Sequence, residues 1–203
     1  MTQLDWTKHL TGGRKHTFTT NEVILRPGMD REHFFVILQG RARIHLQHDQ
    51  KELTLAYLKT EDIYVSHSRA WVSAESDLLI ERWPLAQFKR LLSLEPMIAL
   101  QVIQELGHLL HNTINVIEDL SFRSVSQRLS RALLLSSKHQ QSESIDLPYN
   151  MQELAQQLGT SRQTLSTEFN QLIKQGLIKR LSRKKIKLLQ PERLSNICEG
   201  FVS

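Results

Sequence analysis

A short polar segment near the C-terminus holds residue types that read DNA, at the spacing of one helix face. Ser161 is followed by Arg162 and Gln163, and Ser166 and Thr167 come one helical turn later. An arginine can donate two hydrogen bonds to guanine, and a glutamine can pair with an adenine edge. Serine and threonine hydroxyls suit bases or phosphates. The segment therefore predicts a helix that contacts bases in the major groove.

The elements around this segment follow the helix-turn-helix pattern. Residues 151–158 have the apolar spacing of a short helix, and Gly159 suits the left-handed conformation that ends a helix. Ser161 is a favourable N-cap for the next helix. That helix would bury Leu165, Phe169 and Leu172 on one side. In a helix-turn-helix the second helix lies in the major groove, which is where Arg162 would be placed.

Basic residues continue beyond this motif. Residues 179–188 alternate basic and apolar side chains and predict a hairpin wing. We expect four of its residues to contact phosphates: Arg180, Arg183, Lys184 and Lys185. Residues 123–203 carry 13 lysines and arginines against 6 acidic residues, whereas the rest of the chain has a net charge of −2. This asymmetry points to a polyanionic partner for the C-terminal part.

The N-terminal part reads as β structure. Short apolar or alternating runs separated by turn residues predict strands at residues 22–25, 34–38, 41–46, 53–58, 71–74 and 78–83. Residues 62–68 read as a loop. Such a series is typical of a sandwich, a roll or a barrel.

A long helix follows the strands. Its apolar residues alternate at spacings of four and three, as in a coiled-coil seam: Ala99, Ile103, Leu106, Leu110, Thr113, Ile117 and Leu120. Other apolar residues, such as Leu100, Val102 and Leu109, fall off this seam, so two sides of the helix are apolar. The pattern predicts packing on the β structure and on the same helix of a second copy. The alternative is a core helix within one subunit.

Composition excludes several classes of protein. Apolar residues make up 40% and charged residues 23% of the chain, which is typical of a soluble globular protein. No apolar run is long enough for a membrane span, and the N-terminus has no signal-peptide layout. The single cysteine, Cys198, suits a reducing cytoplasm. Sequence motifs of the common enzyme classes are missing, so we do not expect an enzyme.

Together these features resemble the CRP/FNR superfamily of transcription regulators. The resemblance covers nearly the whole chain and includes the turn at Gln39-Gly40 and the segment from Gly159 to Thr164. It implies an α+β fold with three parts. These are a cyclic-nucleotide-binding-like β-roll at 1–95, a long dimerisation helix at 96–122, and a winged helix-turn-helix at 123–203. A homodimer would bind a palindromic operator on double-stranded DNA and, as an activator, would engage RNA polymerase.

Within the superfamily the chain is similar to the CooA-type carbon monoxide sensors, which bind haem b. The matching stretches include residues 53–58, the loop with His67, residues 117–120 and residues 161–167. The resemblance implies His67 as an iron ligand, with the effector pocket on the long helix formed by Ile103, Leu106, Gly107 and Leu110. Two features depart from these sensors: Val65 replaces a redox-active cysteine, and the N-terminus is shorter. The second ligand is therefore open between the Met1 amine, His108, His111 and none.

Other effectors are weighed against haem. Cyclic AMP is disfavoured, because the chain lacks the Gly-Glu pair and the short helix that would hold its phosphate between Asp62 and Arg69. A four-cysteine iron–sulfur cluster is excluded by the single cysteine. Two readings stay open beside a ligand-controlled regulator: a regulator whose β-roll is only structural, and a haem or gas carrier that does not bind DNA.

Overall fold

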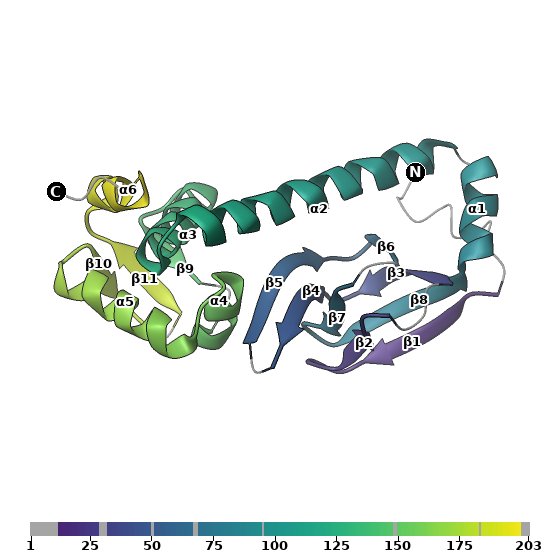
Figure 1. Ribbon diagram of the computed structural model, residues 1–203, viewed down its shortest axis with the longest axis horizontal. Helices are drawn as coiled ribbons and strands as arrows, with labels where there is room; N and C mark the ends of the chain where they lie inside the picture. Colours follow the sequence, from purple (N-terminus) through teal and green to yellow (C-terminus); the bar gives the residue numbers. More distant parts are fainter. Residues whose placement is uncertain are drawn as a thin grey trace. The chain divides into compact units, whose positions relative to one another are not determined.

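The computed structural model describes residues 12–28, 32–49, 51–66, 69–94, 96–147, 150–182 and 184–199 (Figure 1). These residues form two compact units. The first contains the described residues up to 49 together with residues 54–114, and the second contains residues 51–53 and the described residues from 115 onward. Among the described residues, no helix is both long and apolar enough to cross a membrane.

Two four-stranded sheets make up the β-rich part. Their strand orders are β1-β8-β3-β6 and β2-β7-β4-β5 (Figure 1). The strands are β1 (Arg14–Phe18), β2 (Val23–Leu25), β3 (His33–Gln39), β4 (Ala42–His48), β5 (Lys51–Leu58), β6 (Ile63–Val65), β7 (Trp71–Ala74) and β8 (Leu78–Pro84). The neighbours in these orders are mostly far apart in sequence, as in a roll. The predicted β-roll is confirmed.

Strand β3 explains how this unit holds together. Phe35 and Ile37 pack in the cluster that joins the two sheets. Phe34 and Val36, which alternate with them, pack on the other face with Trp83. That second cluster also takes in residues of α1 (Leu85–Leu94) and of the start of α2 (Pro96–Phe122). A strand buried on both faces reads as a continuous apolar run, which is the pattern seen in the sequence.

The second unit is a winged helix-turn-helix. Its elements are α3 (Val125–Gln140), β9 (Ser144–Asp146), α4 (Met151–Gln157), α5 (Arg162–Lys174), β10 (Ile178–Arg180), β11 (Lys185–Leu188) and α6 (Pro191–Glu199). The three strands form one antiparallel sheet in the order β10-β11-β9 (Figure 1). One apolar cluster joins the helices to this sheet through residues such as Leu129, Leu165, Ile186 and Leu194. The predicted fold class is therefore confirmed.

Several elements differ from the sequence prediction. β6 lies within residues 62–68, which read as a loop, because Tyr64 pairs with Phe35 of β3. β1, α1, β9 and α6 are additional elements that the patterns did not predict. The three-part division at residues 95/96 and 122/123 stays a prediction.

Candidate nucleic-acid interface

The start of α5 is fixed by two local structures. Gly159 has φ +61°, and the Thr160 and Gly159 N–H groups donate to the carbonyls of Ala155 and Gln156 at 3.0 and 3.4 Å. This is the Schellman arrangement that ends a helix, here α4. The Ser161 hydroxyl then accepts a hydrogen bond from the Thr164 N–H at 3.0 Å. Gly159 and Ser161 therefore have the conformations that the sequence predicts.

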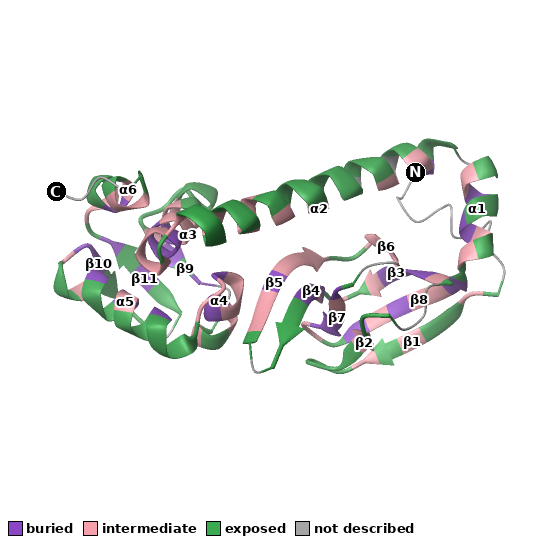
Figure 2. Cartoon of the chain, in the orientation of Figure 1, coloured by how far each residue is buried: buried purple, intermediate pink, exposed green. Residues whose placement is uncertain are grey.

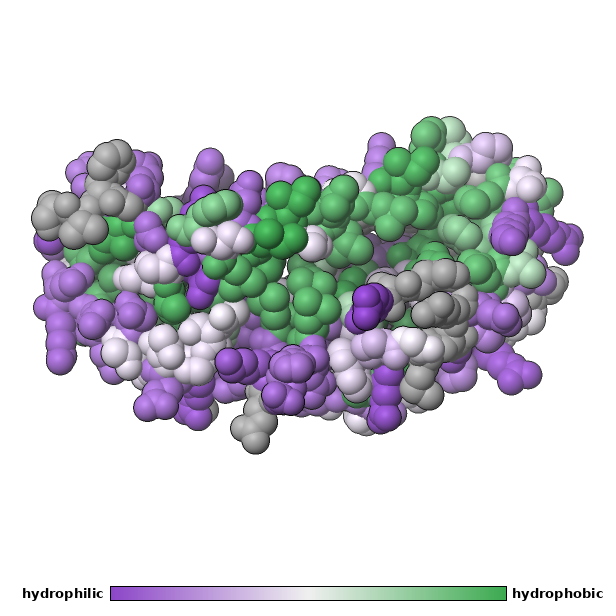
Figure 3. Space-filling view, viewed as in Figure 1, coloured by the Kyte–Doolittle hydropathy of each residue, from purple (hydrophilic) through white to green (hydrophobic). Residues whose placement is uncertain are grey.

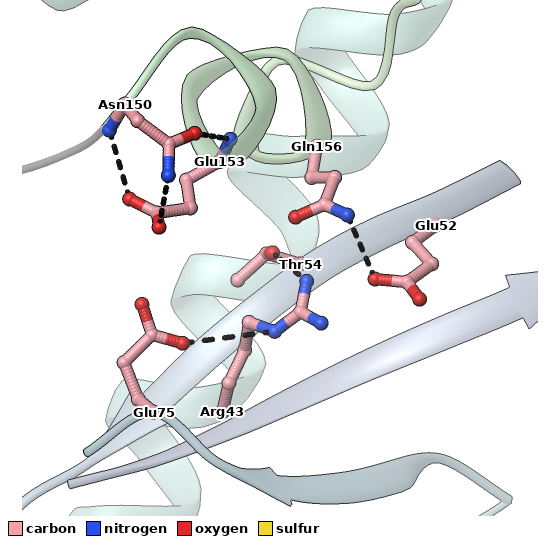
Figure 4. A network of polar contacts seen from close by, with 7 residues as sticks. All are labelled: Arg43, Glu52, Thr54, Glu75, Asn150, Glu153 and Gln156. Atoms are coloured by element: carbon pink, nitrogen blue, oxygen red, sulfur yellow. Dashed lines mark hydrogen bonds and ion pairs between the residues drawn. The ribbon is translucent and has the colours of Figure 1, made fainter. Parts of the chain in front are cut away.

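Helix α4 is capped in the same strict way. The Asn150 carboxamide accepts hydrogen bonds from the N–H groups of Gln152 and Glu153, and the Glu153 carboxylate accepts from the Asn150 N–H at 2.8 Å (Figure 4). Such a capping box satisfies backbone donors at both positions. Both helices of the motif thus begin at defined residues, which gives α5 a fixed position within the unit.

The two sides of α5 have opposite character. Leu165, Phe169 and Leu172 are buried in the core of the unit. Arg162, Gln163 and the other predicted base-contacting residues are all exposed: Ser161, Ser166 and Thr167. The Thr167 hydroxyl donates to the Gln163 carbonyl at 3.2 Å, so this threonine also supports its own helix. The first two turns of α5 therefore present hydrogen-bonding groups from a rigid base.

The wing places some predicted phosphate contacts at the surface and engages another. Lys184 and Lys185 are exposed. The Arg180 guanidinium lies over the Phe169 ring at 6.0 Å and donates to the Ser182 carbonyl, so it also joins the wing to α5. Arg183 lies outside the described residues.

Two lysines that the site prediction omitted are part of the same surface. Lys179 and Lys187 are directly opposite each other on β10 and β11, and both are exposed. Like charges in this position destabilise a strand pair. A bound polyanion would relieve the repulsion. Their alternation with buried Ile178, Ile186 and Leu188 was visible in the sequence and could have identified them.

Helix α2 has an apolar face that the first unit does not cover. Val102 and Leu109 pack against the clusters of that unit. Predicted seam residues are instead largely exposed, with Ile103 at 62%, Leu110 at 61% and Ile117 at 56%. Leu106 and Leu120 are also exposed, whereas Ala99 and Thr113 are half-buried. Figure 2 shows α2 exposed along most of its length, and Figure 3 shows hydrophobic residues along its course.

The predicted effector residues fall in two groups. Gly107, Ile103, Leu106 and Leu110 are exposed on α2, and a Cβ atom at Gly107 would meet no atom within 4 Å. His67 lies outside the described residues. A cavity of about 20 Å³ inside the roll is lined by residues that include His16, His33 and Arg82, and it has room for about one water molecule. Burial lowers the pKa of Arg82 there. The cavity is therefore too small for an organic effector.

Comparison with known proteins gives consistent results. Residues 127–197 match the Crp-like helix-turn-helix domain. The cAMP-activated global transcriptional regulator CRP of Pasteurella multocida is 24% identical over 176 residues, covering 80% of this chain and 84% of that protein. A CooA mutant from Carboxydothermus hydrogenoformans superposes with a TM-score of 0.81 at 28% identity, covering 92% of this chain and 88% of that one. The reduced CO-sensing protein of R. rubrum gives 0.55 at 28% identity, covering 92% and 90%.

Proposed function

Because the chain belongs to the CRP/FNR superfamily of DNA-binding transcription regulators, we propose that it binds a palindromic operator as a homodimer under the control of a small effector. The observation that carries this proposal is the start of α5. There a capped helix buries its apolar side and exposes Arg162, Gln163 and Ser166. Arg162 would read a guanine and Gln163 an adjacent base, while the wing lysines would hold phosphates.

Dimerisation is supported by the uncovered face of α2. A contiguous apolar stripe along a helix of 27 residues, at heptad spacing, is suited to pairing with a second copy of itself. Pairing would place two copies of α5 on the same side of a duplex, where consecutive half-sites are about 34 Å apart. Recognition of RNA polymerase is expected only if the protein activates transcription. DNA as the target also implies a cytoplasmic protein.

A selection from a random duplex library tests this function. The full chain is mixed with the library, and bound duplexes are sequenced after competition with heparin. We expect enrichment of a palindrome whose half-sites are separated by one helical turn, about 10 base pairs. Binding that shows no sequence preference, or a strictly monomeric protein, would contradict the proposal.

Haem b is the effector-binding group that the resemblance to CooA favours. The described part of the site fits an apolar planar group, because Ile103, Leu106 and Leu110 surround Gly107 on an exposed apolar face. His67 would supply the imidazole ligand that suits iron. The haem would supply a site for a diatomic gas such as CO or NO, and the α2 residues would exclude water from it. A ligand bound there shifts the protein only by its different affinities for two conformations.

Absorption spectra separate the effector hypotheses. With haem added, we expect a Soret band that His67→Ala alters and that His48→Ala, at an exposed surface histidine, leaves unchanged. An operator affinity that rises with cyclic AMP, and no haem spectrum, would instead favour the ligand named for the CRP relatives. No response to either ligand would favour a regulator with a structural β-roll. A haem spectrum without any DNA binding would indicate a haem or gas carrier.

A further inference from the structure

Three arginines converge on one aspartate where α2 meets α3. The Asp119 carboxylate accepts from Arg123 Nη1 at 2.5 Å through one oxygen and from Arg131 Nη1 at 3.2 Å through the other. The Asp119 backbone carbonyl accepts from Arg128 Nη1 at 3.3 Å. All four residues belong to the second unit. We call Asp119, Arg123, Arg128 and Arg131 the Asp119 cluster.

This cluster differs from an ordinary surface ion pair. The Asp119 side chain is only 20% exposed, and it is bound from both its own helix and α3. Arg128 is buried, and burial lowers the pKa of its guanidinium while the charge of Asp119 raises it. Because buried charges are costly when their partners are removed, these groups hold one geometry. The cluster therefore fixes the angle between the end of α2 and α3.

Two further contacts join the end of α2 to the helix-turn-helix. Leu120 packs so closely on the turn before α5 that a Cβ atom at Gly159 would lie 2.6 Å from Leu120 Cδ2. Helix α3 begins directly after Arg123, with Ser124 as its N-cap in a capping box with Gln127. The connection between the helices thus contains no free loop. Residues 115–122 of α2 are structurally part of the second unit.

We propose that Asp119 is a positioning residue that determines which half-site spacing the dimer recognises. It would do so by fixing the direction of α5 relative to the end of the paired helix. This inference rests on the proposed function, because spacing has meaning only for a dimer on a palindrome. Two linked recognition helices bind together only when their geometry matches the two half-sites. Asp119 does not contact DNA in this scheme but acts through α3.

The test compares Asp119→Asn with Glu118→Gln, a matched loss of one negative charge at the exposed neighbouring residue. Affinities are measured for the selected palindrome, for versions with the half-sites moved by one to three base pairs, and for a single half-site. Wild type and Glu118→Gln should show one sharp optimum. Asp119→Asn should flatten the profile and lose about tenfold at the optimum, with half-site affinity within about twofold of wild type.

Unchanged optimum and sharpness in Asp119→Asn would overturn the proposal. An equal loss on the single half-site would overturn it too, since the residue would then only stabilise the unit. If Asp119→Asn does not fold, Arg131→Gln removes one ion pair and should broaden the profile less, while Arg131→Lys should restore part of it. An Arg131→Gln profile identical to wild type would again overturn the proposal. Absence of any spacing preference in wild type would instead count against the proposed function.

Discussion

Helices α2 and α5 differ in where their apolar residues lie. In α5, Leu165, Phe169 and Leu172 are all at most 2% exposed, and the opposite side is polar. In α2, Ile103 and Leu110 are more than half exposed, although Val102 and Leu109 pack on the first unit. Helix α5 is therefore complete within one chain, and its free side is suited to a polar ligand. Helix α2 is incomplete, because its free side is the kind of surface that another protein covers.

This difference teaches how the two helices divide the work of recognition. A polar surface on a capped helix can be exposed at no cost in stability, so it can wait for a ligand that comes and goes. An apolar surface of this extent needs a lasting partner. Substitutions on α2 should therefore act through assembly, and substitutions on α5 through sequence reading.

The largest effect is expected from a charge on the free side of α2. Ile117→Glu would place an unpaired carboxylate in the apolar seam, which costs about 3–5 kcal/mol. The dimer dissociation constant should rise at least about 100-fold. Sedimentation equilibrium measures this change. His108→Glu, at an exposed position off the seam, should leave the dimer intact. A dimeric Ile117→Glu protein would show that the face of α2 serves another purpose.

A smaller effect is expected at the start of α5. Arg162→Ala should weaken binding to the selected operator by about 1–3 kcal/mol, or tenfold to a few hundredfold, through loss of a bidentate contact. The dimer should be unaffected. Arg193→Ala, which removes the same charge from exposed α6, should change operator affinity only slightly. Fluorescence anisotropy on specific and scrambled duplexes gives both values. Equal losses for the two variants would remove Arg162 from the base-reading residues.

The wing offers a prediction in which stability and binding move in opposite directions. Lys187→Thr should relieve the repulsion with Lys179 and raise the free energy of unfolding by about 0.2–1 kcal/mol. It should also lower the slope of log affinity against log salt by about 0.9, the share of one phosphate contact. Lys179→Thr should behave alike. In the double variant the salt effects should add, while the gain in stability should not, because one repulsion is relieved only once.

The sequence predicts those parts of the molecule whose signals are local. Gly159 and Ser161 define the turn and the start of α5 without reference to the rest of the chain, and the heptad spacing defines α2. Helix α6 was missed because it has nine residues and one buried residue, Leu194. Its stability comes from packing against α3 and not from propensity. β1 was missed because Arg14, Lys15 and His16 hide its alternation.

The less predictable features of the site depend on distant residues. Arg180 looks like a free phosphate contact in the sequence, yet its guanidinium lies over Phe169 because the wing folds back on α5. The pair Asp119 and Arg123 has helical spacing and could have been predicted. Arg131 joins it only because α3 turns back at the capped junction. Ion pairs of this kind follow from the tertiary fold.

The smallest predicted effect tests whether α5 owes its order to its cap. Ser161→Ala removes the hydroxyl that accepts from the Thr164 N–H, and it should lower the free energy of unfolding by about 1 kcal/mol. Denaturant unfolding without DNA measures this change apart from any contact that Ser161 makes with a phosphate. Ser121→Ala, at an exposed serine of α2, should leave stability within about 0.5 kcal/mol. Equal stabilities for the two variants would mean that burial of Leu165 and Phe169 alone orders α5.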